Sequence, residues 1–136
     1  MKTKIIFYLI YLATSTLLTA QDKISLTDIE KVRVYLSLDE HSFYSIKSIV
    51  KEIEAILEED KKIIDEIKER VKNDDEPGFF EKIKIKKGRD DRISRIKSLT
   101  KKIENQLDKE QKEKFKNVIK PELKGLKKEE IFNTKQ

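Results

Sequence analysis

The sequence of 136 residues contains no cysteine and only one histidine, His41. The absence of cysteine excludes disulfide bonds and thiolate metal sites. Structural zinc sites take about four protein ligands and catalytic zinc sites about three, so a single histidine argues against either. We therefore expect no metal and no cofactor, and we interpret His41 as a polar residue in the first turn of a helix.

Glycine and proline are also scarce, with three and two residues respectively, and neither occurs between Gln21 and Lys72. Because both residues interrupt helices, their absence favours a long helical stretch. The chain is 42% charged, whereas ordinary domains are about 25% charged. This composition favours long helices with narrow apolar seams over a large compact core.

No combination of residues in the sequence indicates catalysis. The acidic clusters at 58–60 and 74–76 lie in solvent-facing or linker sequence, where nothing would separate the pKa values of their carboxyls. The sequence has no Gly-rich phosphate loop and no EF-hand spacing. The net charge of +5 comes without any nucleic-acid-binding signature. We therefore expect neither an enzyme nor a nucleic-acid-binding protein.

The first twenty residues have the pattern of a secretory signal peptide. Two lysines precede an apolar run over residues 5–18, and Ala20 offers a small residue for cleavage. A membrane-spanning helix needs roughly 17–25 apolar residues, so we expect cleavage and no stable membrane anchor afterwards. Residues 1–20 are thus predicted to be removed, and residues 21–136 to be periplasmic or secreted.

The mature region is predicted to form a single all-α domain. Apolar residues recur at spacings of three and four, which is typical of amphipathic helices. We expect helices over about residues 27–36, 38–72, 89–106 and 108–120, and a short one over 122–132. We expect these long antiparallel helices to form a hairpin-like or cradle-shaped bundle that is dimeric.

Two segments depart from the helical pattern. Asp60 occupies a position of the 38–72 stripe where an apolar residue is expected, and a bend, a register shift or an exposed stretch could each explain it. Lysine and isoleucine alternate over residues 82–86, as in a short strand. Because a lone strand has no pairing partner in a helical chain, we expect an irregular or briefly helical connector there.

Two of the predicted helix starts share a pattern. Its residues are Leu36, Ser37, Glu40 and Tyr44 in the first start, and Leu107, Asp108, Gln111 and Phe115 in the second. In each, a leucine is the last residue on the apolar face of the preceding helix, and a polar residue caps the next helix. The Glu or Gln side chain accepts a hydrogen bond from a free backbone amide. The aromatic then falls on the same face four residues later. We expect a tight corner at each repeat, and a further capping box at Thr27 and Glu30.

This pair of motifs resembles the Leu-Thr-x-x-Gln repeats of the Spy/CpxP family of periplasmic stress proteins, over most of residues 26–125. The strict matches are Leu36, Leu107 and Gln111. Ser37 and Asp108 stand where the family has threonine, and Glu40 where it has glutamine. The resemblance implies a small helical protein, often a dimeric cradle, that acts as an ATP-independent chaperone, a regulator of envelope-stress signalling or a metal-stress sensor.

The resemblance also implies a client-binding surface. A chaperone of this kind presents basic side chains beside apolar ones, so that charge attracts an unfolded client and weak apolar contacts hold it. The candidates are Phe79, Phe80, Lys82, Lys84, Lys86, Lys87, Arg89, Arg92 and Arg95. The same charges also fit an ordinary solvated face, and the two phenylalanines could instead cover the end of a helix seam.

Two other classes of function are compatible with the sequence. The long helix could form an intermolecular coiled coil in a structural or surface-interaction protein of the cell envelope, although its seam does not keep a sustained heptad. A small exported inhibitor or immunity-type protein is the other. The expected partners are accordingly unfolded or envelope proteins and a second copy of the chain.

Overall fold

The computed structural model describes residues 23–127. These residues form four α-helices, α2 (Ile29–Leu36), α3 (Glu40–Lys72), α4 (Phe79–Glu104) and α5 (Lys109–Phe115). The β-type pairing within this range is an isolated bridge between Ser25 and Ile119. The prediction of an all-α protein is confirmed, whereas the predicted signal peptide lies outside the described residues.

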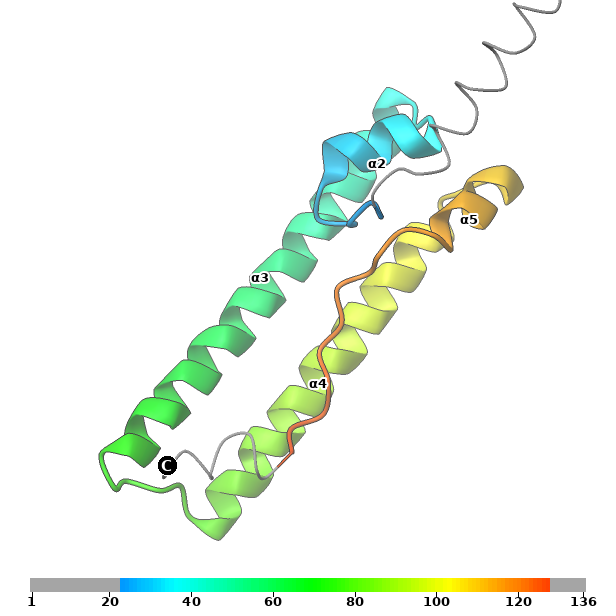
Figure 1. Cartoon of the computed structure of the whole chain (residues 1–136). Helices are drawn as coiled ribbons and strands as arrows, with labels where there is room; N and C mark the ends of the chain where they lie inside the picture. The colour runs from blue at the N-terminus through cyan, green and yellow to red at the C-terminus, as the bar shows by residue number, and fades with distance from the viewer. Residues whose placement is uncertain (1–22, 128–136) are drawn as a thin grey trace, which may run out of the picture.

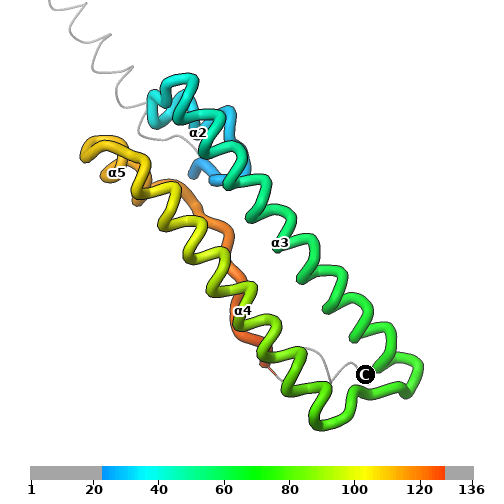
Figure 2. Tube along the Cα trace, turned by 180° about the vertical axis from the view of Figure 1, so that it is seen from behind, coloured from blue at the N-terminus to red at the C-terminus, as the bar shows by residue number. Residues whose placement is uncertain are grey.

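Helices α3 and α4 are long and run antiparallel along the molecule (Figure 1), joined by the turn at residues 73–78. Helix α3 has 33 residues, which corresponds to about 50 Å at 1.5 Å per residue. Helices α2 and α5 contact each other at the end far from this turn. Residues 119–127, the C-terminal strap, then run back beside α4 in extended form (Figure 2).

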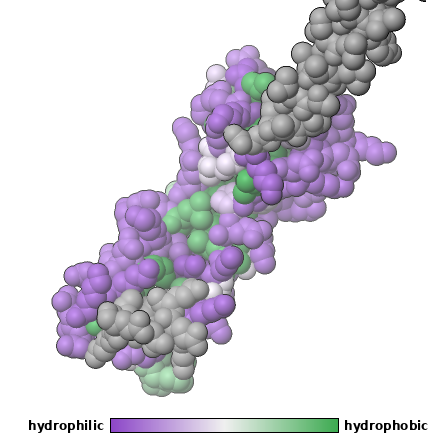
Figure 3. Space-filling model, in the orientation of Figure 1, coloured by the Kyte–Doolittle hydropathy of each residue, from purple (hydrophilic) through white to green (hydrophobic). Residues whose placement is uncertain are grey.

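Two apolar clusters hold the helices and the strap together. The main core gathers side chains from all four helices, with Leu123 of the strap packed against it. A smaller cluster joins Ile67 and Val71 of α3 to Ile85 of α4 and Leu126 of the strap. The strap therefore covers the seam between the two long helices, and Figure 3 shows apolar surface along the middle of this face between polar flanks.

Helix α4 begins at Phe79, so the prediction of a connector over residues 82–86 with a helix start near 89 is wrong. Ile85 packs into the smaller cluster, and this tertiary contact explains why the Lys–Ile alternation is helical. Gly88 lies inside α4 and does not break it. A Cβ on Gly88 would lie 3.4 Å from Nη1 of Arg92, at the short end of ordinary van der Waals contact.

The end of the chain differs from the prediction as well. Helix α5 ends at Phe115 rather than near residue 120, and residues 122–127 are not helical. The backbone N–H of Ile119 donates to the carbonyl of Ile24 at 2.8 Å, and that of Leu26 donates to Ile119 at 2.9 Å. These long-range bonds take the place of helical ones. Residues 128–132 of the predicted last helix lie outside the described residues.

Two of the three predicted capping boxes are wrong. Asp28, not Thr27, is the N-cap of α2, and it makes no side-chain capping bond. Ser37 ends α2 in the left-handed conformation, with φ of 52°, so it cannot start the next helix. Asp39 caps α3 instead, by accepting a hydrogen bond from the backbone N–H of Ser42 at 2.7 Å. This bond lowers the pKa of the Asp39 carboxyl.

The capping box at α5 is confirmed. The Asp108 carboxylate accepts from the backbone N–H of Gln111 at 2.8 Å, and the Gln111 side-chain oxygen accepts from the Asp108 N–H at 3.0 Å. Nε2 of Gln111 also donates to the carbonyl of Leu36 at 3.1 Å. The residues of the two predicted corners therefore meet in space, where α5 lies against the end of α2.

The correct register of the first corner is two residues later than predicted. Aligned on their capping aspartates, the two helix starts share a buried leucine before the cap and a buried apolar residue two turns after it. These residues are Leu38, Asp39 and Ile46 in the first, and Leu107, Asp108 and Phe115 in the second. Tyr44 is exposed, and Phe43 is the aromatic that enters the core.

Candidate functional site

The first turn of α4 carries exposed aromatic side chains. Phe79 and Phe80 are 72% and 78% exposed, and Ile83 in the next turn is 50% exposed. The two rings contact each other edge to face, with centroids 5.6 Å apart. We call these three residues the apolar tip. Figure 3 shows apolar surface at the lower end of the molecule, where α4 begins in Figure 1. Contiguous exposed apolar side chains mark a candidate interaction site.

Ion pairs between α3 and α4 hold the tip in place. Nε of Arg70 lies 2.8 Å from Oδ2 of Asp75 in the turn, and Nη1 of Arg70 lies 2.5 Å from Oε1 of Glu81 in α4. Lys82 pairs with Glu76 at 2.7 Å. The hydrogen bonds from the Arg70 guanidinium lower the pKa values of Asp75 and Glu81. Arg70 thus fixes the path of the chain into the exposed first turn of α4.

We expect the Arg70 pairs to weaken in acid. Their contribution to stability is complete above the ordinary pKa values of 3.8 and 4.5 for Asp75 and Glu81. It is lost as the pH falls through the lowered folded-state values. A carbon-13 NMR titration of the side-chain carboxyls should show both pKa values below these ordinary ones. In an Arg70→Gln variant both should return toward them; unchanged titration curves would contradict the assigned cause.

Three of the predicted basic residues extend the exposed face of α4 beyond the tip. Lys84, Lys86 and Lys87 are exposed. Lys84 follows Phe80 by four positions and Lys87 follows Ile83 by four, so they lie on the same helix face. Arg95 is further along α4, where Nη2 lies 4.0 Å from a carboxylate oxygen of Glu52. The structure therefore places apolar and cationic side chains next to each other on one helix.

Arg89 and Arg92 do not belong to this surface. Nε of Arg92 donates to Oδ1 of Asp60 at 2.8 Å, and Nη1 of Arg89 donates to Oδ2 of Asp60 at 2.5 Å. Asp60 is 3% exposed and Arg92 is also buried. The prediction that these arginines face a client is therefore wrong, because both guanidiniums point into the seam between α3 and α4.

The same ion pairs explain why Asp60 interrupts the apolar stripe of α3. The residue lies within a continuous helix and is buried, so an exposed stretch is not the cause. Nε of Arg89 also donates to the carbonyl of Lys124 at 3.0 Å, which links this cluster to the C-terminal strap. The sequence does contain a signal for this cluster. It is an acidic residue within the apolar stripe of one helix, together with two arginines three positions apart on the facing helix.

His41 is exposed in the first turn of α3. Residues 23–127 contain no group of three or more His, Cys, Asp or Glu side chains that could hold a metal. No helix in that range combines the length and the apolar character that crossing a membrane requires. Comparison with protein-family models, characterised proteins and solved structures gives no match to this chain.

Proposed function

We propose that this chain is an exported, ATP-independent chaperone of the Spy/CpxP type that holds unfolded proteins at its apolar tip. The observation that carries the proposal is the joint exposure of Phe79, Phe80 and Ile83 in the first turns of α4. Proteins rarely leave a group of large apolar side chains in water unless it meets a partner. The proposed activity is binding and includes no covalent chemistry.

The small size of the apolar tip favours weak, reversible binding of a client. Burying one such side chain contributes about 1.5–3 kcal/mol, whereas association costs an estimated 4–15 kcal/mol. Three side chains therefore give only weak binding, from which a client can leave to fold. Lys84, Lys86 and Lys87 add a positive field that raises the rate of encounter with acidic segments of a client.

A dimeric cradle belongs to the same proposal. Two copies would present two apolar tips to one client, and the second contact would be favoured by its high effective concentration. The alternative, an intermolecular coiled coil along α3, is less favoured because the apolar stripe of α3 is already buried against α4 and the strap.

The proposal can be tested by suppression of aggregation of a chemically unfolded client without ATP. The Phe79→Ser, Phe80→Ser double variant should need at least about tenfold more protein for the same suppression, because each lost contact is worth roughly 1 kcal/mol or more. Its helicity should not change, since both side chains are exposed. Suppression should also fade with added salt, which screens the lysines.

A matched control is available on the same molecule. Val34 and Tyr44 are also exposed apolar residues, and they lie on α2 and at the start of α3, far from the tip. The Val34→Ser, Tyr44→Ser variant should suppress aggregation as well as the unaltered protein does. If the two double variants behave alike, the apolar tip is not the client-binding surface.

A further inference from the structure

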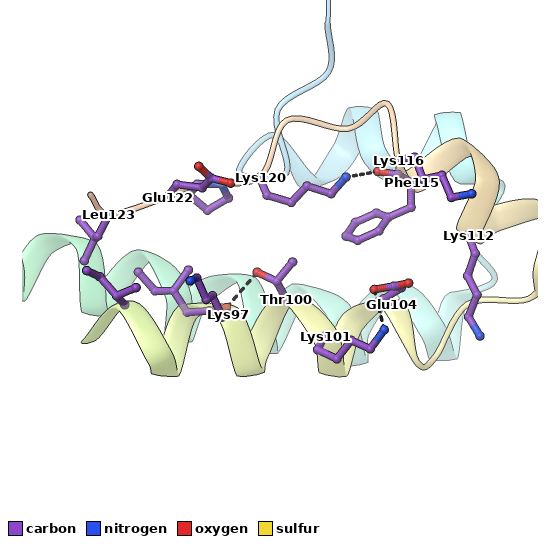
Figure 4. Close-up of a pocket in the computed structure, with 13 residues that line it drawn as sticks. Lys97, Thr100, Lys101, Glu104, Lys112, Phe115, Lys116, Lys120, Glu122 and Leu123 are labelled. Atoms are coloured by element: carbon purple, nitrogen blue, oxygen red, sulfur yellow. Dashed lines mark hydrogen bonds and ion pairs between the residues drawn. The ribbon is translucent and has the colours of Figure 1, made fainter. Parts of the chain in front are cut away.

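A pocket of about 530 Å³ lies between α4, α5 and the C-terminal strap, away from the apolar tip. This volume is within the range of roughly 300–1,000 Å³ that small-molecule sites occupy. Its apolar lining includes Ile96 of α4, Phe115 of α5 and Leu123 of the strap. Figure 4 shows the Phe115 ring and Thr100 extending into the space between the strap and α4.

The polar lining of the pocket is predominantly cationic. Five lysines line it but only two carboxylates, those of Glu104 and Glu122. The lysines are Lys97, Lys101, Lys112, Lys116 and Lys120. They come from α4, from α5 and its C-terminal end, and from the strap, so the fold gathers side chains that are distant in the sequence (Figure 4).

Carboxylates of the protein neutralise only part of this charge. Lys101 pairs with Glu104 at 3.2 Å, and Lys116 pairs with Glu113, which lies outside the pocket, at 2.7 Å. Within residues 23–127, Lys97, Lys112 and Lys120 form no ion pair with a carboxylate. The pocket therefore keeps an excess of positive charge above an apolar floor.

Lys120 is the most enclosed of these three. Its ammonium donates to the carbonyl of Phe115 and lies 4.4 Å from the centroid of the Phe115 ring. Burial lowers the pKa of Lys120, and the negative charge of Glu104 offsets this effect only in part, so the charged form lacks some of the solvation it would have in water. An anion in the pocket would supply that missing stabilisation.

We infer that this pocket binds a small amphipathic anion, in which one carboxylate or similar head group is joined to an apolar tail. The head group would meet the lysines through charge-assisted hydrogen bonds. The tail would bury apolar area against Ile96, Phe115 and Leu123. The inference does not depend on the proposed function, because none of these residues belongs to the apolar tip.

The inference is tested by measuring the binding of decanoate to the purified full-length protein. Calorimetric titration should show saturable binding, and decanol and acetate should each bind at least about tenfold more weakly, since each lacks one half of the recognition. Amide NMR shifts should change at residues 93–104 and 112–123 and not at 79–87. Equal affinity for decanol, or shifts confined to the tip, would overturn the inference.

Three variants locate the site within the molecule. Lys97→Gln with Lys112→Gln should weaken decanoate binding by about fivefold to tenfold, as expected for two partly exposed ion pairs. Lys86→Gln with Lys87→Gln removes the same charge elsewhere on α4 and should have no effect. Thr100→Trp should fill the pocket and abolish binding while helicity is retained. If Thr100→Trp retains both its helicity and its affinity, the ligand does not occupy this pocket.

Discussion

Replacing Asp60 with alanine should lower the free energy of unfolding by about 3–5 kcal/mol, the usual effect of removing one partner from a buried ion pair. The carboxylate is almost fully enclosed and receives hydrogen bonds from both Arg89 and Arg92. Nη2 of Arg92 is already buried without a hydrogen-bond partner in the described structure. Without Asp60, two positive charges would remain in the seam, and of their described hydrogen bonds only that from Arg89 to the Lys124 carbonyl would offset the lost hydration.

A second variant separates loss of the ion pair from loss of packing. Asp60→Leu combined with Arg89→Met and Arg92→Leu removes all three charges and refills the seam with apolar side chains. Such replacements are often neutral or stabilising by about 1–4 kcal/mol, so this variant should be far more stable than Asp60→Ala. Urea unfolding measures both. A loss below about 1 kcal/mol in Asp60→Ala would mean that the arginines find other partners or reach water.

Replacing Leu107 with alanine should lower the free energy of unfolding by about 2–5 kcal/mol. Leu107 is buried in the main core at the corner between α4 and α5. Its truncation would leave a cavity where the capping box of Asp108 fixes the direction of the chain. Denaturant unfolding followed by circular dichroism gives the value.

Val34→Ala is the control for this substitution, because Val34 is 79% exposed. Surface replacements of this kind usually change stability by no more than about 0.5 kcal/mol. If Leu107→Ala is equally mild, Leu107 is not a core residue and the corner at α5 is held in some other way.

The sequence predicts α3 well because its signal is local and long. The apolar stripe from Ile46 to Val71 repeats with helical spacing, and no glycine or proline competes with it. The start of α4 is harder to predict. It depends on Ile85 packing against Ile67 and Val71 of α3, and this contact is not visible in a local pattern.

The C-terminal strap and the ion pairs of Asp60 are not predicted from the sequence for the same reason: both depend on contacts between residues that are distant in the sequence. Ile119 bonds to Ile24 and Leu26 near the other end of the described chain, so its extended conformation has no local signature. Asp60 and its arginines are 29 and 32 positions apart. The exposure of Phe79 and Phe80 is easier to anticipate, because a Pro-Gly turn that carries two adjacent aromatic side chains cannot easily bury both.

Photo-crosslinking can show whether clients bind at the apolar tip, as we propose. A benzophenone amino acid placed at position 80, and separately at position 34, reports which surface lies against a chemically unfolded client. Both positions are exposed, so neither label should disturb the fold. We expect client adducts from position 80 and few from position 34, with the difference lost once the client has folded. Equal adducts from both positions, or adducts only from position 34, would contradict the claim.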